Sequence, residues 1–217
     1  MAINTYATLV SAVTEWLARD QDATLIARIP DFITLCEAKL NRTLFVPQME
    51  QRSTAMVNTA SDEPEFISLP SDFQTMRRVR LSGVTGKPRL NFMSQTQLED
   101  YRYSIDNVSD RPVYFTIVGT EMELAPTPNE DYALEMVYRA NIPALTASNT
   151  TNWLLTLAPD LYLYGALLEA MPAIKNDDRI AVWANGFSTV LNDLNNLGER
   201  QSFDSGPTSI SLPGVTP

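Results

Sequence analysis

Histidine is absent from this 217-residue sequence, and cysteine occurs once, at Cys36. Without histidine the chain lacks the usual general base of serine and cysteine nucleophiles, and the imidazole ligands of most metal sites. Cys36 can form no disulfide within the chain. Its neighbours Ile33, Leu35 and Leu40 follow a helical pattern that predicts a buried structural thiol. These shortages exclude most catalytic sites, leave carboxylate-only catalysis open and favour a reducing cytoplasm.

The sequence also lacks the short motifs that bind cofactors and the long apolar runs that cross membranes. We find no G-x-G-x-x-G, Walker-type lysine loop, C-x-x-C or H-E-x-x-H, and charges or prolines interrupt each apolar run well before about 20 residues. The amphipathic N-terminus does not resemble a signal peptide. We therefore expect no cofactor, no metal and no membrane. Three close carboxylate pairs are predicted to serve as a helix cap, a loop and an exposed strand face: Asp177/Asp178, Glu63/Glu65 and Glu121/Glu123.

Positive charge is scarce, since 26 acidic residues oppose 16 basic ones and the formal net charge is −10. This balance argues against a sequence-independent grip on nucleic acid, which needs clustered Lys and Arg. The one local concentration is Arg77, Arg78 and Arg80. Their alternation with Val79 and Leu81 favours a solvated strand edge. A nucleic-acid contact and a salt bridge between protomers stay open as alternatives.

The first part of the chain, residues 1–47, is predicted to be helical. Thr5 is a suitable N-cap for a helix, and Pro30 either kinks the next segment or opens a new helix, which Pro47 ends. The apolar positions recur at spacings of three and four, and they are Tyr6, Leu9, Val10, Val13, Trp16 and Leu17 in the first helix, and Phe32, Ile33, Cys36, Leu40 and Leu44 later.

The middle, residues 48–141, changes to the alternation of strands. Two runs around Gly119-Thr120 predict a β-hairpin, and the run 132–140 predicts a further strand. Shorter strands are expected near Phe66 and in the run 76–81, where the odd positions form the apolar side. Ser94 is predicted to cap a one-turn helix. We expect a small antiparallel sheet or sandwich.

Helical spacing returns in residues 142–200. Pro159-Asp160 is a favourable helix start, and Gly198 is predicted to be the C-cap of the last helix. The tail 201–217 is rich in Ser, Pro and Gly and is expected to be flexible. The fold class is therefore α+β, a helical bundle built from both ends of the chain with an inserted β-rich region. Its expected apolar faces are Leu161, Tyr164, Leu167, Leu168 and Met171, then Ile180, Trp183, Phe187, Val190, Leu191 and Leu194.

Several segments, taken in order, resemble the adaptor proteins of tailed bacteriophages, the head-to-tail connector or head-completion subunits that dock below the portal. The resemblance runs from about residue 4 to residue 197. It is carried by YATLVSAVTEWLAR, IPDFITLCEAKLNRTL, FISLPSDF, RPVYFTIVG, NTTNWLLTLAPDLYLYGALLEA and DDRIAVWANGF.

This resemblance implies a structural protein of the virion neck, without catalytic residues, assembled in the host cytoplasm. It implies a homo-oligomeric ring, commonly of twelve copies, with the portal protein on one face and a tail tube or nozzle protein on the other. Double-stranded DNA would pass through the lumen without specific binding. In related adaptors a C-terminal extension reaches the portal. The matching portal-binding residues here would be Ser202, Phe203, Ile210, Leu212, Pro213 and Val215.

Assembly contacts are expected at Trp153 and Leu154, an apolar group in a polar loop, and at the three arginines Arg77, Arg78 and Arg80. Two other functions remain open. The β region could be a ligand- or glycan-binding module of a phage tail structure, with Tyr101, Tyr103 and Tyr114 as stacking surfaces. A carboxylate-dependent enzyme would need several acids to converge on one cleft.

Overall fold

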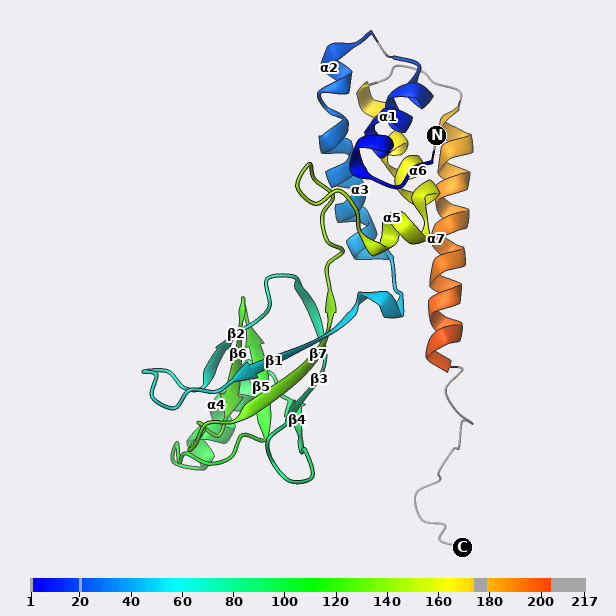
Figure 1. Ribbon diagram of the computed structural model, residues 1–217. Helices are drawn as coiled ribbons and strands as arrows, with labels where there is room; N and C mark the ends of the chain where they lie inside the picture. Colours follow the sequence, from blue (N-terminus) through cyan, green and yellow to red (C-terminus); the bar gives the residue numbers. More distant parts are fainter. Residues whose placement is uncertain (1, 20, 174–178, 204–217) are drawn as a thin grey trace, which may run out of the picture. The chain divides into compact units, whose positions relative to one another are not determined.

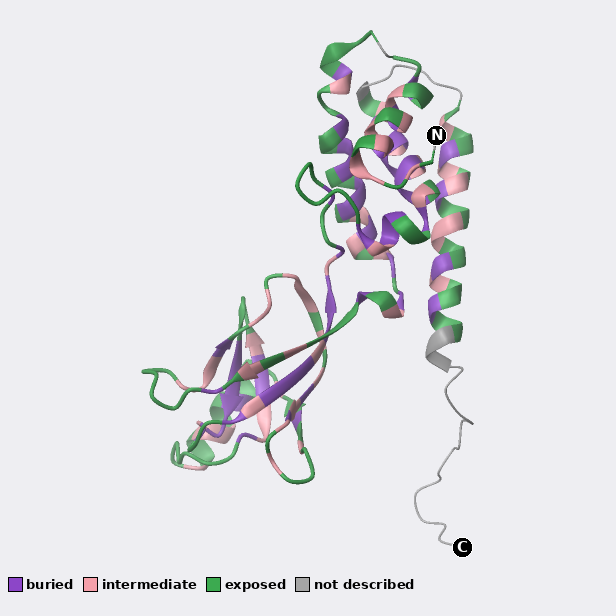
Figure 2. Ribbon diagram, in the orientation of Figure 1, coloured by how far each residue is buried: buried purple, intermediate pink, exposed green. Residues whose placement is uncertain are grey.

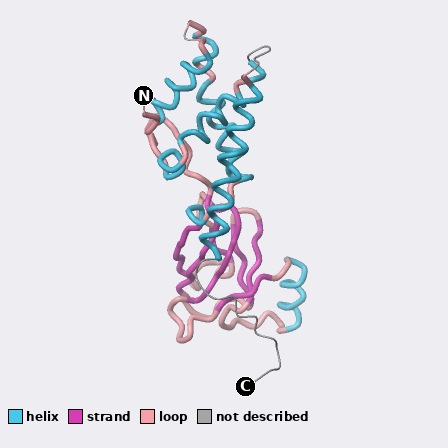
Figure 3. Tube along the Cα trace, turned by 90° about the vertical axis from the view of Figure 1, so that its right-hand side faces the viewer, coloured by secondary structure: helices cyan, strands magenta, loops and turns pink. Residues whose placement is uncertain are grey.

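The computed structural model describes residues 2–19, 21–173 and 179–203. The chain divides into two compact units. A helical unit contains the chain up to Gln48 and from Ile142 onward, and a β unit contains Met49–Asn141. Figure 1 labels the elements of both, and Figure 3 shows the strands together in the β unit with one helix among them. The fold class is α+β, as the sequence predicts.

Local signals define the helices of the helical unit. The Thr5 hydroxyl accepts a hydrogen bond from the Thr8 amide, and the Thr8 hydroxyl accepts one from the Thr5 amide. This capping box gives α1 the predicted cap. Pro30 lies in the first turn of α3, so it opens that helix and does not kink it. The elements are α1 (Tyr6–Leu17), α2 (Ala23–Ile26), α3 (Ile29–Thr43), α5 (Trp153–Leu157), α6 (Pro159–Glu169) and α7 (Ile180–Phe203), with 3-10 turns at Pro47–Met49 and Met171–Ala173.

Helix α6 is the centre of the helical unit. It packs against α1, α3 and α7. The sequence predicts a single apolar face for it, but the side chain of Tyr162, outside that face, is fully buried. A helix that is covered on several sides needs apolar residues around most of its circumference, and α6 has them. Its buried residues are Leu161, Tyr162, Leu163, Gly165, Ala166 and Leu167.

Helix α7 buries a stripe that includes Trp183, Phe187 and Leu194, and Figure 2 shows it buried on one side and exposed on the other. The predicted C-cap at Gly198 is wrong, since α7 continues to Phe203. A Cβ at Gly198 would lie 2.7 Å from the carbonyl oxygen of Phe45. This glycine is therefore explained by the close approach of two backbones, which a side chain would block.

Within the described residues, seven strands form one curled sheet in the order β1-β7-β3-β4-β5-β6-β2. β5 and β6 make the predicted hairpin, with Gly119 at a φ of 62° in its turn. The strands and the one helix among them are β1 (Glu50–Met56), β2 (Phe66–Ser68), β3 (Phe73–Leu81), β4 (Arg89–Phe92), α4 (Gln95–Ser104), β5 (Tyr114–Val118), β6 (Glu121–Ala125) and β7 (Ala133–Ala140).

The sheet is mixed, whereas the sequence predicts an antiparallel one. β4 and β5 pair in parallel. The chain between them contains α4, and a helical crossover is the ordinary connection between parallel neighbours. Ser94 caps this helix as predicted, but it runs for ten residues and not for a single turn.

β7 lies between β1 and β3 and sends Leu134, Met136 and Tyr138 into the core of the β unit. From β3, Val79 and Leu81 join them, which confirms the odd-numbered apolar side there. The alternation fails at Arg77, which is exposed, because the β3–β7 register shifts between Met76 and Arg78. A bulge of this kind inserts an unpaired residue and redirects its side chain.

Candidate functional site

A cluster of arginines surrounds one carboxylate on the outer face of the sheet. Glu135 of β7 lies directly opposite Arg80 of β3, and β1 borders it on the other side. Its Oε1 is 2.7 Å from Nη2 of Arg80 and 3.7 Å from Nη2 of Arg78, and its Oε2 is 2.9 Å from Nη2 of Arg52. Opposite charges on directly facing residues are a favourable cross-strand pair.

The charges of this cluster do not cancel. Hydrogen bonding to Arg80, followed by that to Arg52, lowers the pKa of Glu135 to about 2, although burial acts in the opposite direction. The carboxylate is therefore ionised at neutral pH, and one negative charge meets three guanidinium groups. The Glu135 side chain is 4% exposed while that of Arg52 is 64% exposed. The excess positive charge is thus available at the surface.

Further arginines lie on this side of the sheet, the exposed Arg89 and the buried Arg139. Arg89 of β4 pairs with Arg80 in register, and Arg139 of β7 pairs with Glu50 of β1. Burial, followed by the charge of Arg77, lowers the pKa of Arg139. Arg77 approaches Glu50 with its Nε 3.3 Å from Oε1. We call this set the arginine face: it comprises Arg52, Arg77, Arg78, Arg80, Arg89 and Arg139, with Glu50 and Glu135 among them.

The sequence prediction contains only half of the arginine face. It identifies Arg77, Arg78 and Arg80 because they are close together in the chain. It misses Arg52, Arg89 and Arg139, and the carboxylate of Glu135 among them. The alternation of β7, which buries Leu134 and Met136, already assigns Glu135 and Arg139 to the opposite face. Pairing with β1 and β3 then brings the three strands' charges together.

Acid should weaken the β unit through Glu135. Its pKa is about 2 when folded and near the ordinary 4.5 when unfolded, so its contribution is present above pH 4.5 and is lost as the pH falls toward 2. We expect Glu135→Gln to lower the urea midpoint of the β unit at pH 7 and to have almost no effect at pH 2. Hydrogen exchange of β3 and β7 peptides at increasing urea concentrations gives the unfolding midpoint of the β unit at each pH. Glu121→Gln, at an exposed position of β6, is the control, and an equal effect at both pH values would contradict the prediction.

The apolar segment that the sequence analysis places in a polar loop is helical, and it begins α5. Asn152 caps the helix by accepting a hydrogen bond from the Leu155 amide. Leu154 is completely buried, whereas Trp153 is half-buried. Trp153, Thr156 and Leu157, together with Gln48, line a shallow pocket of about 370 Å³. The exposed apolar surface of this segment therefore belongs to Trp153 and Leu157.

The predicted portal-binding residues lie at the end of the chain. Ser202 and Phe203 are in the last turn of α7. The other four fall outside the described residues, as do Asp177 and Asp178: they are Ile210, Leu212, Pro213 and Val215.

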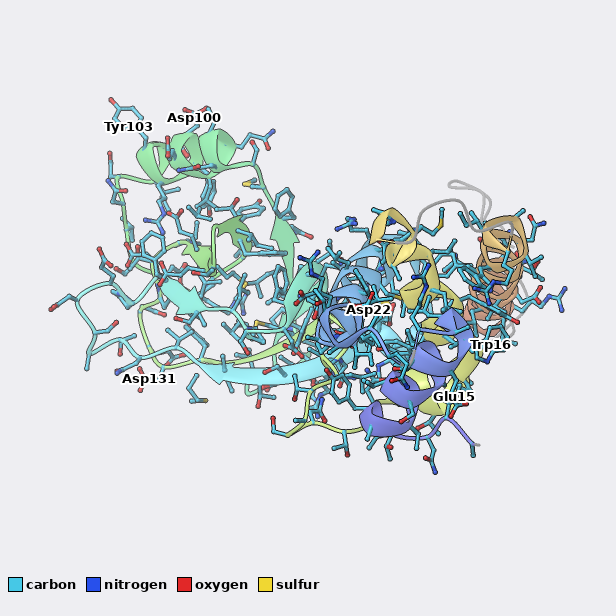
Figure 4. The ribbon with its side chains drawn as sticks, turned by 90° about the horizontal axis from the view of Figure 1, so that it is seen from above. Glu15, Trp16, Asp22, Asp100, Tyr103 and Asp131 are labelled. Atoms are coloured by element: carbon cyan, nitrogen blue, oxygen red, sulfur yellow. The ribbon has the colours of Figure 1, made fainter. Side chains whose placement is uncertain are left out.

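Of the three tyrosines proposed as a stacking surface, two pack against each other and one is exposed. Tyr101 and Tyr114 contact each other edge to face, with ring centroids 4.8 Å apart, so each ring packs on its partner. Tyr103 is 84% exposed and projects from α4 near Asp100, as Figure 4 shows.

The predicted exposure of Glu123 is wrong. It is buried, and its Oε1 lies 3.2 Å from Nη2 of Arg102, which also lies 3.4 Å from Glu65 through Nη1. Arg102 is on α4, and this crossover helix supplies a cation that a pattern within β6 does not reveal. Two of the carboxylates in the sequence pairs are therefore ion-pair partners of one arginine.

The described residues were also compared with the requirements of a metal site and of a membrane-spanning helix. Within residues 2–19, 21–173 and 179–203, no group of three or more His, Cys, Asp or Glu side chains is arranged to hold a metal ion. Over the same residues, no helix has the length and hydropathy needed to span a bilayer.

Comparison with known proteins agrees with the resemblance seen in the sequence. A search of curated proteins finds no match. The family model described as SU10 adaptor protein matches residues 4–211, which is nearly the whole chain. Helices from both ends of the chain with an inserted sheet, and a match of this extent, lead to one conclusion: the chain belongs to the SU10 adaptor family of bacteriophage structural proteins.

Proposed function

We propose that this protein is the head-to-tail adaptor of a tailed bacteriophage. In this role about twelve copies form a closed ring, which docks on the portal and receives the tail tube or nozzle on its other face. The observation that carries the proposal is the family match over residues 4–211. The protein acts by binding and catalyses no reaction.

The charge balance supports passage of DNA through such a ring without tight binding. The net charge of −10 repels phosphates, and no lysine cluster offsets it. In the arginine face, Arg52, Arg78 and Arg80 all converge on the carboxylate of Glu135. These guanidinium groups are therefore partly engaged within the protein.

The C-terminal segment from Ser202 to Pro217 is proposed to bind the portal. Ile210, Leu212 and Val215 alternate with small or polar residues in a Ser/Pro/Gly-rich tail. An extended segment of this kind can order on a partner and bury a large surface for its length. In the helical unit, the exposed parts of Trp153 and Leu157 are proposed as a further assembly contact.

Removal of residues 204–217 is expected to weaken portal binding by at least about tenfold, since the apolar anchors of the tail are lost. The full chain and the truncated chain would each be mixed with the portal protein encoded beside it. Native mass spectrometry would then count the bound copies. A chain with the same tail residues in scrambled order is the matched control, and it should bind as poorly as the truncated chain.

Failure of the full chain to bind an intact portal ring would overturn the adaptor proposal. The glycan-binding module would then become the leading account, with the exposed Tyr103 as the first residue to test. Equal binding by full and truncated chains would leave the adaptor role standing and would exclude the tail as its portal contact.

A further inference from the structure

A groove of about 670 Å³ opens in the β unit where two strands diverge. β3 pairs with β7 along its whole length, but its register with β4 comprises only Val79–Leu90 and Arg80–Arg89. Before Val79, β3 and β4 separate, and the groove lies between them. It is lined by the residues 73–79 of β3, the residues 89–92 of β4, and Phe115 and Ile117 of β5.

The groove has an apolar floor and a cationic rim. Leu90, Val79 and Phe115 are buried at its base. Phe92 is 63% exposed, packed edge-on against Phe115 with ring centroids 5.7 Å apart. Such an exposed ring beside a concave surface is typical of a contact site.

Arg77, Arg78 and Arg89 border this floor. Arg77 and Arg78 each have a carboxylate nearby, at 3.3 and 3.7 Å. Arg89 is exposed, and among the described residues it has no ion-pair partner. A polypeptide segment that carries carboxylates next to small apolar residues therefore complements the groove in both charge and polarity.

The same unit presents such a segment in the loop that joins β1 to β2. Residues 58–65, which we call the acidic loop, read NTASDEPE. Asp62 and Glu63 are exposed, and among the described residues neither has an ion-pair partner. The base of the loop is held in place, because the amide and the hydroxyl of Thr59 both donate hydrogen bonds of 2.8 Å to Asp131.

The groove and the acidic loop lie at different places in the strand order of the sheet. β3 and β4 are neighbours in the middle of the strand order, whereas β1 and β2 are its two ends. The acidic loop connects those two end strands along the chain. In Figure 1 the loop extends to the left of the β unit, away from β3 and β4. A contact between a loop and a groove on opposite sides is head-to-tail, and such contacts build a ring when the rotation between neighbours closes.

We propose that the acidic loop of one copy docks in the groove of the next, with Asp62 and Glu63 facing Arg89 and Arg77. Each chain supplies one loop and one groove of complementary charge, so every loop in a closed ring meets one groove. The inference rests on the proposed ring and assigns the contact that links its neighbouring β units.

Charge reversal tests this contact in the full chain. The loop variant carries Asp62→Arg and Glu63→Arg, and the groove variant carries Arg89→Glu. Arg77 is left intact because it already pairs with Glu50. Like charges facing each other should lower the fraction of portals that carry a complete ring by at least about tenfold in each variant. Combining the changes should restore most of that fraction.

A matched control places the same change in charge elsewhere. Glu99→Arg with Asp100→Arg alters two adjacent exposed acids on α4 and should assemble like the wild type. As a second readout, Ser61→Cys in the loop and Asn91→Cys in the groove are combined in one chain. Disulfides between neighbouring copies on the portal should then give a ladder of linked oligomers, and the buried Cys36 should not compete with them.

The outcomes separate this contact from the adaptor role. Complete rings from both reversal variants, or losses that the combined variant does not restore, would overturn the contact and leave the adaptor role intact. Absence of the ladder in cysteine chains that still fill the portal would also overturn it. If the wild type itself forms no ring on the portal, the proposed function fails and this inference fails with it.

Discussion

Gly165→Ala is expected to destabilise the helical unit by about 2 kcal/mol, because overpacking outweighs the gain in helix propensity. Gly165 lies where α6 crosses α3, and a Cβ there would overlap the sulfur of Cys36 and lie 3.1 Å from Cε2 of Phe187. Close-packed interiors have no free space to absorb a methyl group. Tryptophan fluorescence during urea unfolding reports this unit selectively, since Trp16, Trp153 and Trp183 all belong to it.

A second substitution identifies the cause. Cys36→Ala removes the overlapping sulfur. The double variant Gly165→Ala/Cys36→Ala should therefore lose less free energy of unfolding than the two single variants lose together. Gly83→Ala in the β unit is the control, followed by hydrogen exchange of that unit, because its Cβ would lie 3.8 Å from Cβ of Ala133, an ordinary contact. Additive effects of the two changes would show that the sulfur is not the obstacle.

Glu37→Ala is expected to destabilise the helical unit by about 3 kcal/mol, through lost hydrogen bonds and a small cavity. Glu37 is buried on α3, where its Oε1 accepts hydrogen bonds from the Leu145 amide at 2.8 Å and from the Tyr162 hydroxyl at 3.1 Å. Asn152 in turn donates to the Tyr162 oxygen at 2.7 Å. Loss of the carboxylate leaves two buried donors without an acceptor. Glu37→Gln keeps an acceptor and should be much milder.

The pH response of this site should be opposite to that of Glu135. Burial raises the pKa of Glu37, although the bonds from Leu145 and Tyr162 oppose the shift. A carboxyl whose folded pKa exceeds its unfolded pKa binds more protons when folded, so its contribution is full below about pH 4.5 and declines as the pH rises through the folded pKa. Urea midpoints followed by tryptophan fluorescence from pH 4 to pH 7 should fall for the wild type relative to Glu37→Gln. Parallel curves for the two proteins would contradict this.

Local signals along the chain were sufficient for most of the element types, although α5 was predicted as a loop. The cap at Thr5, the proline that opens α3, the cap at Ser94 and the turn at Gly119 all act between residues a few positions apart. Such short-range interactions depend on the neighbouring sequence alone, so they can be read without knowledge of the fold. The resemblance of ordered segments to phage adaptors was also present in the sequence, and the family match confirms it.

Tertiary structure decided what depends on distant partners. Arg52, Arg80 and Glu135 are far apart in the chain and meet only because β7 pairs with both β1 and β3 in one register. The approach of Phe45, remote in sequence, explains Gly198 inside α7, where the local pattern predicts a cap. Strand register, helix crossings and the divergence of β3 from β4 arise from packing across the whole unit. For that reason most elements, the family and three of the arginines could be predicted from local sequence, whereas the complete arginine face and the groove required the fold.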